Sequence, residues 1–252
     1  DATGNNKNGA DYQGSMADFL MLVIVDKTEN TYSFLQFNRD TMTEVALIDH
    51  NGEGEATANI QLCTAHWYGG NREQSCENTV KSVKKLLGGI QIDGYYELNM
   101  SEIPKLNSMV DGVTVTLEDD LSKKYPKMKK GATINLDDEQ AYAYVHDRYG
   151  VGDEENTSRM KRQQQYMTGF FKKLQEKVKA NPNYANEVFE SLQDVSTTDI
   201  AIGKISNISN IFASGTDKGI FELAGKSKIG QALGDEMDHM EFYVNKKAMV
   251  ST

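Results

Sequence analysis

The sequence predicts one α/β domain in which helices cover a β-sheet, and three observations support that class. Segments that alternate like half-buried β-strands and segments with the three-to-four-residue period of amphipathic helices follow one another along the chain. With 252 residues, 38% of them hydrophobic, the chain can build one large core or two small ones. No internal repeat is visible, which excludes a repeat architecture.

The single domain is expected over residues 16–252, of which residues 181–252 carry the weakest patterns. Residues 1–15 are rich in Gly, Asn and Asp, a composition typical of a flexible lead-in. The longest apolar run, 19–25, suits a buried strand and is too short to span a membrane. Because the chain starts at Asp1 rather than Met, we expect that an upstream segment precedes it.

Two strands begin the domain. Residues 19–25 are apolar on both faces, as expected of a central strand covered by helices, and residues 32–37 form the second strand. A polar turn over residues 26–31 joins them. A glycine-containing loop region, residues 52–70, follows.

Helices and further strands come after this loop region. Residues 76–89 have Val and Leu at helical spacing and end in glycines, which is typical of a helix C-terminus. Residues 156–181 form the clearest helix, because an apolar stripe recurs there every three to four residues. We also expect a helix over 101–112 capped by Ser101, a strand from Val113, a helix over 135–148 capped by Asp137 or Asp138, a helix over 198–213 and a strand over 239–245.

Charge and cysteine content limit the function classes. The net charge of −10 argues against nonspecific binding to nucleic acid, so we expect no nucleic-acid partner and a monomeric protein. The two cysteines, Cys63 and Cys76, are compatible with free thiols in the cytosol and with a disulfide outside it. The sequence alone leaves both open.

The longest predicted helix carries a group of polar side chains on one arc. At about 100° per residue, Arg159, Arg162, Gln163 and Tyr166 fall within roughly 100° of each other and flank the apolar stripe. Two guanidiniums one turn apart repel each other unless an anion lies between them, and their forked geometry suits phosphate oxygens. Arg148 would bring a third guanidinium. The alternative is a solvated basic face, and the helix by itself favours that alternative.

A second group of polar residues lies where the first two strands end. Asp18 precedes the first strand, and Arg39 and Asp40 follow the second. If these strands are antiparallel neighbours, their free ends lie side by side and bring both carboxylates together. Two adjacent carboxylates are costly unless they share a proton or a cation. Beside phosphate-binding arginines, the predicted cation is Mg²⁺ or Mn²⁺.

Five motifs in fixed order give the chain a family resemblance. These motifs are "FNRDT", "GGIQIDGYYELN", "LNSMVDGVTV", "AYAYVHDR" and "RMKRQQ", which lie between residues 17 and 174 together with the strand "DFLMLVIVD". The chain resembles the LytR-CpsA-Psr enzymes of bacterial cell envelopes. This resemblance implies an α/β/α sandwich with a mainly mixed sheet, placed on the outer face of the cytoplasmic membrane. A cytoplasmic and transmembrane anchor would then precede Asp1.

The resemblance also implies an activity and a set of site residues. Members of the family move a glycopolymer from a polyprenyl-pyrophosphate carrier to peptidoglycan, commonly to the 6-hydroxyl of N-acetylmuramic acid. Carried over by position, the magnesium ligands are Asp18 and Asp40. The residues expected to hold the pyrophosphate are Arg39, Arg148, Arg159, Arg162 and Gln163, with catalysis expected at Arg39, Asp40, Arg148 and Arg159.

Three positions depart from the family pattern. His146 stands where the family often has a second arginine, so an imidazole is expected to contact substrate there. Asn156 replaces a frequent aspartate, and Cys63 replaces a frequent asparagine. These departures leave two alternatives open: a lipid pyrophosphatase with the same phosphate clamp, and a polyprenyl-pyrophosphate-binding module without catalysis. The extracellular placement that the resemblance implies favours a Cys63–Cys76 disulfide.

Overall fold

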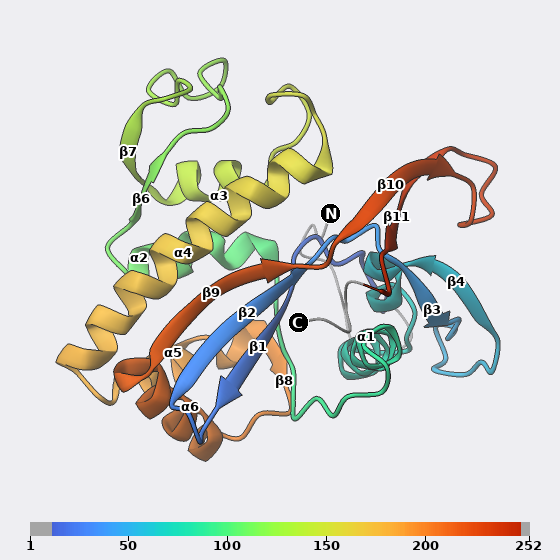
Figure 1. Ribbon diagram of the computed structural model, residues 1–252, viewed down its shortest axis with the longest axis horizontal. Helices are drawn as coiled ribbons and strands as arrows, with labels where there is room; N and C mark the ends of the chain where they lie inside the picture. Colours follow the sequence, from blue (N-terminus) through green and yellow to red (C-terminus); the bar gives the residue numbers. More distant parts are fainter. Residues whose placement is uncertain (1–11, 248–252) are drawn as a thin grey trace.

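The computed structural model describes residues 12–247 and has a three-stranded sheet at its centre, in the order β1–β2–β9 (Figure 1). β1 (Leu20–Asp26) pairs antiparallel with β2 (Thr31–Phe37), whereas β9 (Thr216–Glu222) runs parallel to β2. The central sheet is therefore mixed, and its third strand comes from the C-terminal part of the chain.

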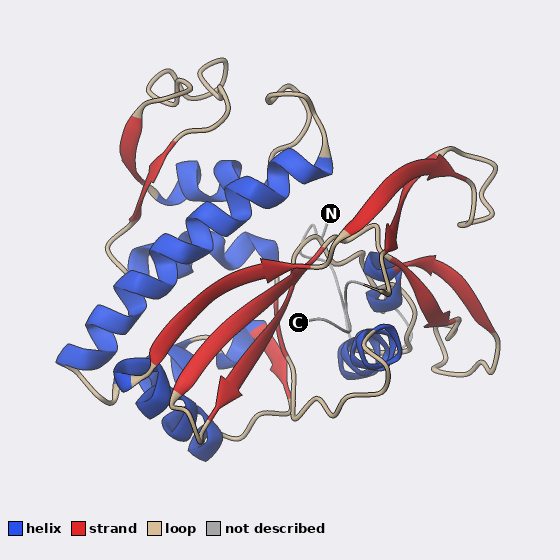
Figure 2. Cartoon of the chain, in the orientation of Figure 1, coloured by secondary structure: helices blue, strands red, loops and turns tan. Residues whose placement is uncertain are grey.

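Helices and short strands surround this sheet (Figure 2). In chain order the remaining elements are β3 (Met42–Ala46), β4 (Thr57–Gln61), the 3₁₀ helix η1 (Leu62–His66), α1 (Arg72–Leu86), β5 (Tyr96–Leu98), η2 (Met100–Glu102), α2 (Ile103–Met109), β6 (Val113–Thr116), β7 (Thr133–Leu136), α3 (Asp138–His146), α4 (Asn156–Ala180), α5 (Tyr184–Ser191), η3 (Gln193–Val195), β8 (Ser196–Thr198), α6 (Ile202–Ser214), β10 (Gly225–Gly230) and β11 (His239–Val244).

The alternation of side chains along β2 explains why helices lie on both faces of the sheet. On one face, the ring of Phe34 stacks on Phe171 of α4 at 4.1 Å between centroids. The ring of Tyr32 lies 4.9 Å from Phe212 of α6 on the same face. On the opposite face, Phe37 belongs to a buried cluster with Val83 of α1. Because successive side chains of a strand point to opposite faces, β2 holds α4 and α6 on one side and α1 on the other. The α/β class is confirmed.

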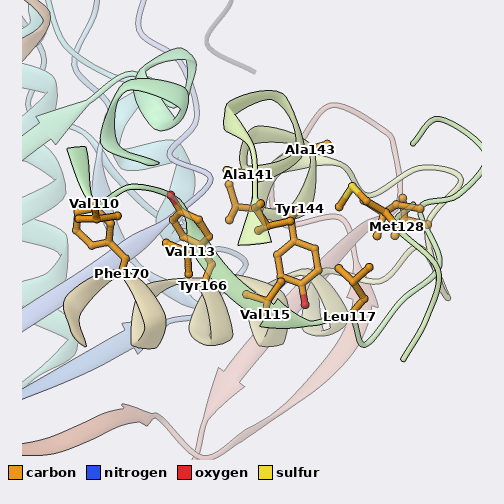
Figure 3. Packing of buried hydrophobic residues seen from close by; sticks show 14 residues of the cluster. Val110, Val113, Val115, Leu117, Met128, Ala141, Ala143, Tyr144, Tyr166 and Phe170 are labelled. Atoms are coloured by element: carbon orange, nitrogen blue, oxygen red, sulfur yellow. The ribbon is translucent and has the colours of Figure 1, made fainter. Parts of the chain in front are cut away.

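The largest apolar core lies beside the central sheet, between α2, α3, α4 and the β6–β7 hairpin. Figure 3 shows Val113 of β6 and Tyr144 of α3 facing Tyr166 and Phe170 of α4, and these side chains are at most 6% exposed. At roughly 25 cal/mol per Å² of apolar surface removed from water, such burial is the main force that fixes α4 against α3. Three elements of this region, α3, α4 and β6, are confirmed, and Asp137 caps α3 through a capping box.

Two expectations about the sheet are wrong. β1 is an edge strand rather than the central one, because β9 joins β2 on its other side. Val23 and Ile24 of β1 are accordingly 52% and 45% exposed. The loop region between the second strand and α1 instead contains the β3–β4 hairpin, whose residues Val45 and Ile60 are buried.

Smaller differences concern element ends and the start of the chain. Ser101 lies inside η2, where the side chain of Asn99 accepts its backbone N–H, so Ser101 does not cap α2. Residues 1–11 of the expected lead-in lie outside the described residues. Tyr12 packs on the domain, with 3% exposure and a 2.7 Å hydrogen bond to Ser75. Between residues 12 and 247, no helix is both long and apolar enough to cross a membrane.

Candidate active site

A tight turn at the end of β2 presents Arg39 and Asp40. The backbone N–H and the hydroxyl of Thr41 both donate to the carbonyl oxygen of Asn38, at 3.0 and 2.6 Å. The side chain of Asn38 accepts the backbone N–H of Asp40 at 2.9 Å. Asn and Thr form such turns through local side-chain hydrogen bonds. The turn therefore fixes the two residues between its ends.

The paired ends of β1 and β2 bring Asp18 to this turn. Leu20 of β1 pairs with Phe37 of β2, so the free ends of the two strands lie side by side as predicted. Nη1 of Arg39 donates to Oδ1 of Asp18. Its Nε lies 3.8 Å from Oδ1 of Asp40, which is within ion-pair range but too far for a hydrogen bond.

Arg159, in the first turn of α4, completes the cluster. Its Nη1 donates to the same Oδ1 of Asp18 at 3.0 Å, so one carboxylate binds two guanidiniums. Asn156 accepts from Nη2 of Arg159 at 2.8 Å and donates to the side chain of Asn38 at 3.1 Å. Asn38 and Asn156 thus connect the strand-end turn to the start of α4. Two features of the sequence could have indicated these amides: Asn38 follows a strand, and Asn156 begins a helix.

The pKa shifts of this cluster follow from burial and from the charges packed against one another. Burial opposes ionisation of Asp18, but Arg39 and then Arg159 outweigh it and lower the pKa of the Asp18 carboxyl. For Asp40, burial outweighs the attraction of the arginines, so its pKa is raised. Burial opposes the charge of Arg39, but neighbours of opposite charge outweigh it and raise its pKa. For Arg159, burial lowers the pKa and Asp18 raises it, but Arg39 and Arg148 lower it again, so its pKa is lowered. An anion beside Arg159 would stabilise its charged form.

Two buried donors in the cluster point to the same need. Nε of Arg39 and Nε of Arg159 are both buried, and neither has a hydrogen-bond partner within the part of the chain that the structure describes. Buried N–H groups are nearly always satisfied in folded proteins, and such exceptions call for an acceptor. Guanidinium N–H groups bind carboxylate or phosphate oxygens most strongly. The arrangement therefore suits an anion with several oxygens.

The polar arc of α4 is the most buried face of that helix, which excludes the solvated basic surface. Arg159, Arg162 and Gln163 are 5%, 1% and 2% exposed. This face packs against α3 and the strand-end turn, while the predicted apolar stripe meets the central sheet through side chains such as Phe171.

Arg162 and Gln163 do not join the cluster around Asp18. Arg162 donates to the carbonyl oxygens of Tyr144 and Asp147 at 2.9 and 2.6 Å, and its Nε lies 3.1 Å from Oδ2 of Asp119. Gln163 donates to the carbonyl oxygen of Val145 at 3.1 Å and accepts from Gln36 of β2 at 3.2 Å. Both side chains therefore attach α4 to the end of α3 and to the sheet. Their expected contact with substrate is not supported by this placement.

His146 and Arg148 lie at the end of α3, on the border of the cluster. The ring of His146 stacks on Tyr142 at 4.7 Å, and its Nδ1 lies 3.2 Å from Oδ1 of Asp147. The guanidinium of Arg148 lies 4.6 Å from the ring centroid of Tyr149. The charge of Arg148 acts on both Asp40 and Arg159, so it is near enough to contribute to the positive field.

The expected Cys63–Cys76 disulfide is wrong, because both cysteines are free and buried. Cys63 lies in η1, and burial raises the pKa of its thiol more than the positive charge of Arg39 lowers it. The sulfur of Cys76, in α1, lies 3.8 Å from Nε2 of His66, and burial raises the pKa of this thiol too. The extracellular placement implied by the family resemblance favoured a disulfide, but both cysteines are free.

The two free cysteines can be tested directly. Denatured protein that has not been treated with a reductant is expected to show two reactive thiols per chain in an Ellman titration. Native protein should react slowly, because buried thiols with raised pKa hold little thiolate. A chain without reactive thiols after denaturation would restore the disulfide.

The two aspartates fit a metal that also binds a phosphate ligand. Within residues 12–247, no group of three or more His, Cys, Asp or Glu side chains could hold a metal ion. Asp18 and Asp40 supply carboxylate oxygens only, and the burial that raises the pKa of Asp40 is the kind of cost that a cation offsets. Mg²⁺ commonly takes one or two protein carboxylates and completes its shell with water and substrate phosphates.

Comparisons with known proteins agree with this architecture. Residues 3–251 match the LytR_cpsA_psr family. No curated protein matches the chain. B. subtilis TagV superposes with a TM-score of 0.70 at 20% identity, covering 95% of this chain and 87% of TagV. B. subtilis TagT gives 0.64 at 21% identity, covering 94% and 82% of the two chains. A structure of TagT bound to LI-WTA gives 0.68 at 20% identity over 94% and 81%.

At these low identities, the superpositions show a shared fold only. The family match spans nearly the whole chain and shows the family. The motifs, the sandwich and the strand-end cluster all lie within the matched residues. The chain belongs to the LytR_cpsA_psr family, whose members transfer glycopolymers to the cell wall.

Proposed function

We propose that this protein transfers a glycopolymer from a polyprenyl-pyrophosphate carrier to peptidoglycan, with Mg²⁺ or Mn²⁺ bound at Asp18 and Asp40. One observation carries the proposal: within residues 12–247, Nε of Arg39 and Nε of Arg159 are buried donors without a hydrogen-bond acceptor, and both guanidiniums contact carboxylates of the cluster. A pyrophosphate supplies oxygens for both guanidiniums, and together with the carboxylates it can complete the coordination of a hard cation.

Each residue of the cluster has a distinct part in this reaction. Arg39 and Arg159 bind the pyrophosphate and stabilise the charge that develops as the bond to the leaving phosphate breaks. Arg148 adds positive charge from the end of α3. Asn38 and Asn156 hold the turn and Arg159 in register. The metal, when bound, neutralises phosphate charge.

In the proposed transfer, the phosphoanhydride bond of the carrier is exchanged for a phosphoester bond to the acceptor. The acceptor hydroxyl attacks the phosphorus that carries the glycopolymer and forms a new phosphoester bond. The bond from that phosphorus to the bridging oxygen breaks, and polyprenyl phosphate leaves. The hydroxyl proton goes to a carboxylate of the cluster, for which Asp40 and Asp18 are the available groups.

Family membership and the WTA ligand of TagT support a glycopolymer as the substrate. The same membership supports peptidoglycan as the acceptor and a place on the outer face of the cytoplasmic membrane, with an anchor upstream of Asp1. The test is a reaction that contains a polyprenyl-pyrophosphate-linked glycan, Mg²⁺ and a peptidoglycan fragment. Product that contains both glycans supports transfer. Release of polyprenyl phosphate that does not depend on the acceptor would indicate a pyrophosphatase. Binding without turnover would indicate a binding module.

Asp40→Ala is expected to abolish metal binding that depends on pyrophosphate. Calorimetry of Mn²⁺ in the presence of farnesyl pyrophosphate should show binding to the native protein and none to the variant. The matched control is Asp120→Ala, which removes an exposed aspartate outside the cluster. If Asp40→Ala keeps the same ligand-dependent metal affinity, the metal assignment is wrong.

A further inference from the structure

Trp67 is the single tryptophan of the chain, and it is exposed beside the cluster. The five residues of η1 immediately before it, Leu62–His66, are all buried, whereas Trp67 is 41% exposed. The exposed part of the indole presents apolar surface to water and is available to a ligand.

The backbone that carries the indole is held in place. The backbone N–H of Trp67 donates to the carbonyl oxygen of Thr64 at 2.9 Å. Gly14 approaches its carbonyl group so closely that a Cβ on residue 14 would lie 2.4 Å from the oxygen. The ring also lies nearly parallel to that of Tyr68, with centroids 6.5 Å apart and 28° between planes. An aromatic side chain with two rotatable bonds on a fixed backbone loses little conformational entropy on binding.

Two antiparallel segments connect Trp67 to the cluster, and we call them the ridge: residues 14–17 and 63–67. Along the ridge, the carbonyl oxygen of Ser15 lies 2.9 Å from Nδ1 of His66, and the N–H of Ala17 donates to the carbonyl oxygen of Cys63 at 3.1 Å. The next residue is Asp18. Four residues span at most about 14 Å when extended, so the backbone of Trp67 lies within a few sugar rings of the site.

The ridge has a chemistry that selects its ligand. Neither of its segments contains an acidic residue, a lysine or an arginine. A polymer with phosphates along its length would need cations there, whereas an uncharged sugar chain would not. The faces of pyranose rings carry C–H groups that pack on aromatic rings, and the rest of the ring is polar. An exposed indole on an uncharged ridge therefore suits a neutral glycan.

We propose that Trp67 and the ridge form the subsite for the acceptor glycan, a chain of N-acetylated sugars that lies on the indole and extends toward Asp18. This inference rests on the proposed function, since it names where the acceptor of the transfer would bind. Trp67 is a substrate-binding residue and takes no part in phosphate binding.

The experiment uses Trp67 as its own reporter, because no other tryptophan contributes to the emission. The tetramer of N-acetylglucosamine is titrated into the protein while tryptophan fluorescence is recorded, and its affinity is measured by calorimetry. We expect a saturable change in emission. Trp67→Ala should weaken the calorimetric affinity at least tenfold, and Trp67→Phe should weaken it less because a flat ring remains.

The matched control is Tyr96→Ala, which removes an aromatic ring that is 38% exposed outside the ridge, and it should leave glycan affinity unchanged. Affinity for farnesyl pyrophosphate should be the same in Trp67→Ala as in the native protein. The subsite is wrong if the tetramer causes no saturable change, or if Trp67→Ala binds it with native affinity. Farnesyl pyrophosphate binding is measured in the same samples. If the native protein does not bind farnesyl pyrophosphate, the proposed function fails. If it binds farnesyl pyrophosphate but not the tetramer, only the subsite is wrong.

Discussion

Arg162→Ala is expected to reduce the free energy of unfolding by about 3–5 kcal/mol, the range for breaking a buried ion pair. The guanidinium is 1% exposed and binds Asp119 together with the carbonyl oxygens of Tyr144 and Asp147. The variant leaves a carboxylate and two carbonyl groups short of donors, at the contact between α3 and α4. Urea denaturation followed by circular dichroism measures the change.

Arg162→Lys serves as the matched variant. A lysine restores one charge near Asp119 but not the forked donors that reach both carbonyl groups, so its recovery of stability should be partial. If Arg162→Ala unfolds within about 0.5 kcal/mol of the native protein, Arg162 is not the structural residue described above. It would then be available for substrate, as the sequence first indicates.

Arg159→Ala is expected to lower the affinity for farnesyl pyrophosphate by roughly ten- to a hundred-fold. The variant loses hydrogen bonds to a charged ligand, which contribute about 1.5–3 kcal/mol, and each 1.4 kcal/mol is a tenfold change in affinity. Stability should change less than in Arg162→Ala, because Arg39 still binds the shared oxygen of Asp18. Isothermal titration calorimetry in Mg²⁺ buffer measures the affinity.

Arg159→Lys gives the matched comparison for this site. The ammonium keeps the charge but cannot reproduce the forked contacts, so the affinity should lie between those of the native protein and Arg159→Ala. Native affinity in Arg159→Ala would show that the buried Nε is not a phosphate donor. The proposed transfer would then lose its main support.

The strand-end cluster was predictable because it depends on local rules. Strands 19–25 and 32–37 are joined by a short polar turn, so antiparallel pairing follows, and with it the approach of Asp18 to Asp40. The turn residues Asn38 and Thr41 are typical turn formers. The sequence pattern did not predict the contact between Asn156 and Asn38, because the two positions lie far apart in sequence.

The sequence did not predict the contacts of Arg162 and Gln163, for a related reason. Helical spacing predicts which side chains share a face, but not which groups pack against that face. Here the carbonyl groups at the end of α3 accept from Arg162 and Gln163, whereas Asp18 binds Arg159. Similarly, β9 was missed because its sequence mixes charged residues and Gly219, although it completes the central sheet.

Arg159 is expected to bind the ligand and Arg162 to stabilise the fold, although the two residues lie one turn apart on the same helix. The most direct test titrates farnesyl pyrophosphate into Arg159→Ala and Arg162→Lys by calorimetry, in the same Mg²⁺ buffer as the native protein and with each variant checked for folding. We predict that Arg159→Ala loses at least tenfold in affinity while folded Arg162→Lys keeps native affinity. Equal losses in both variants, or native affinity in Arg159→Ala, would contradict the assignment.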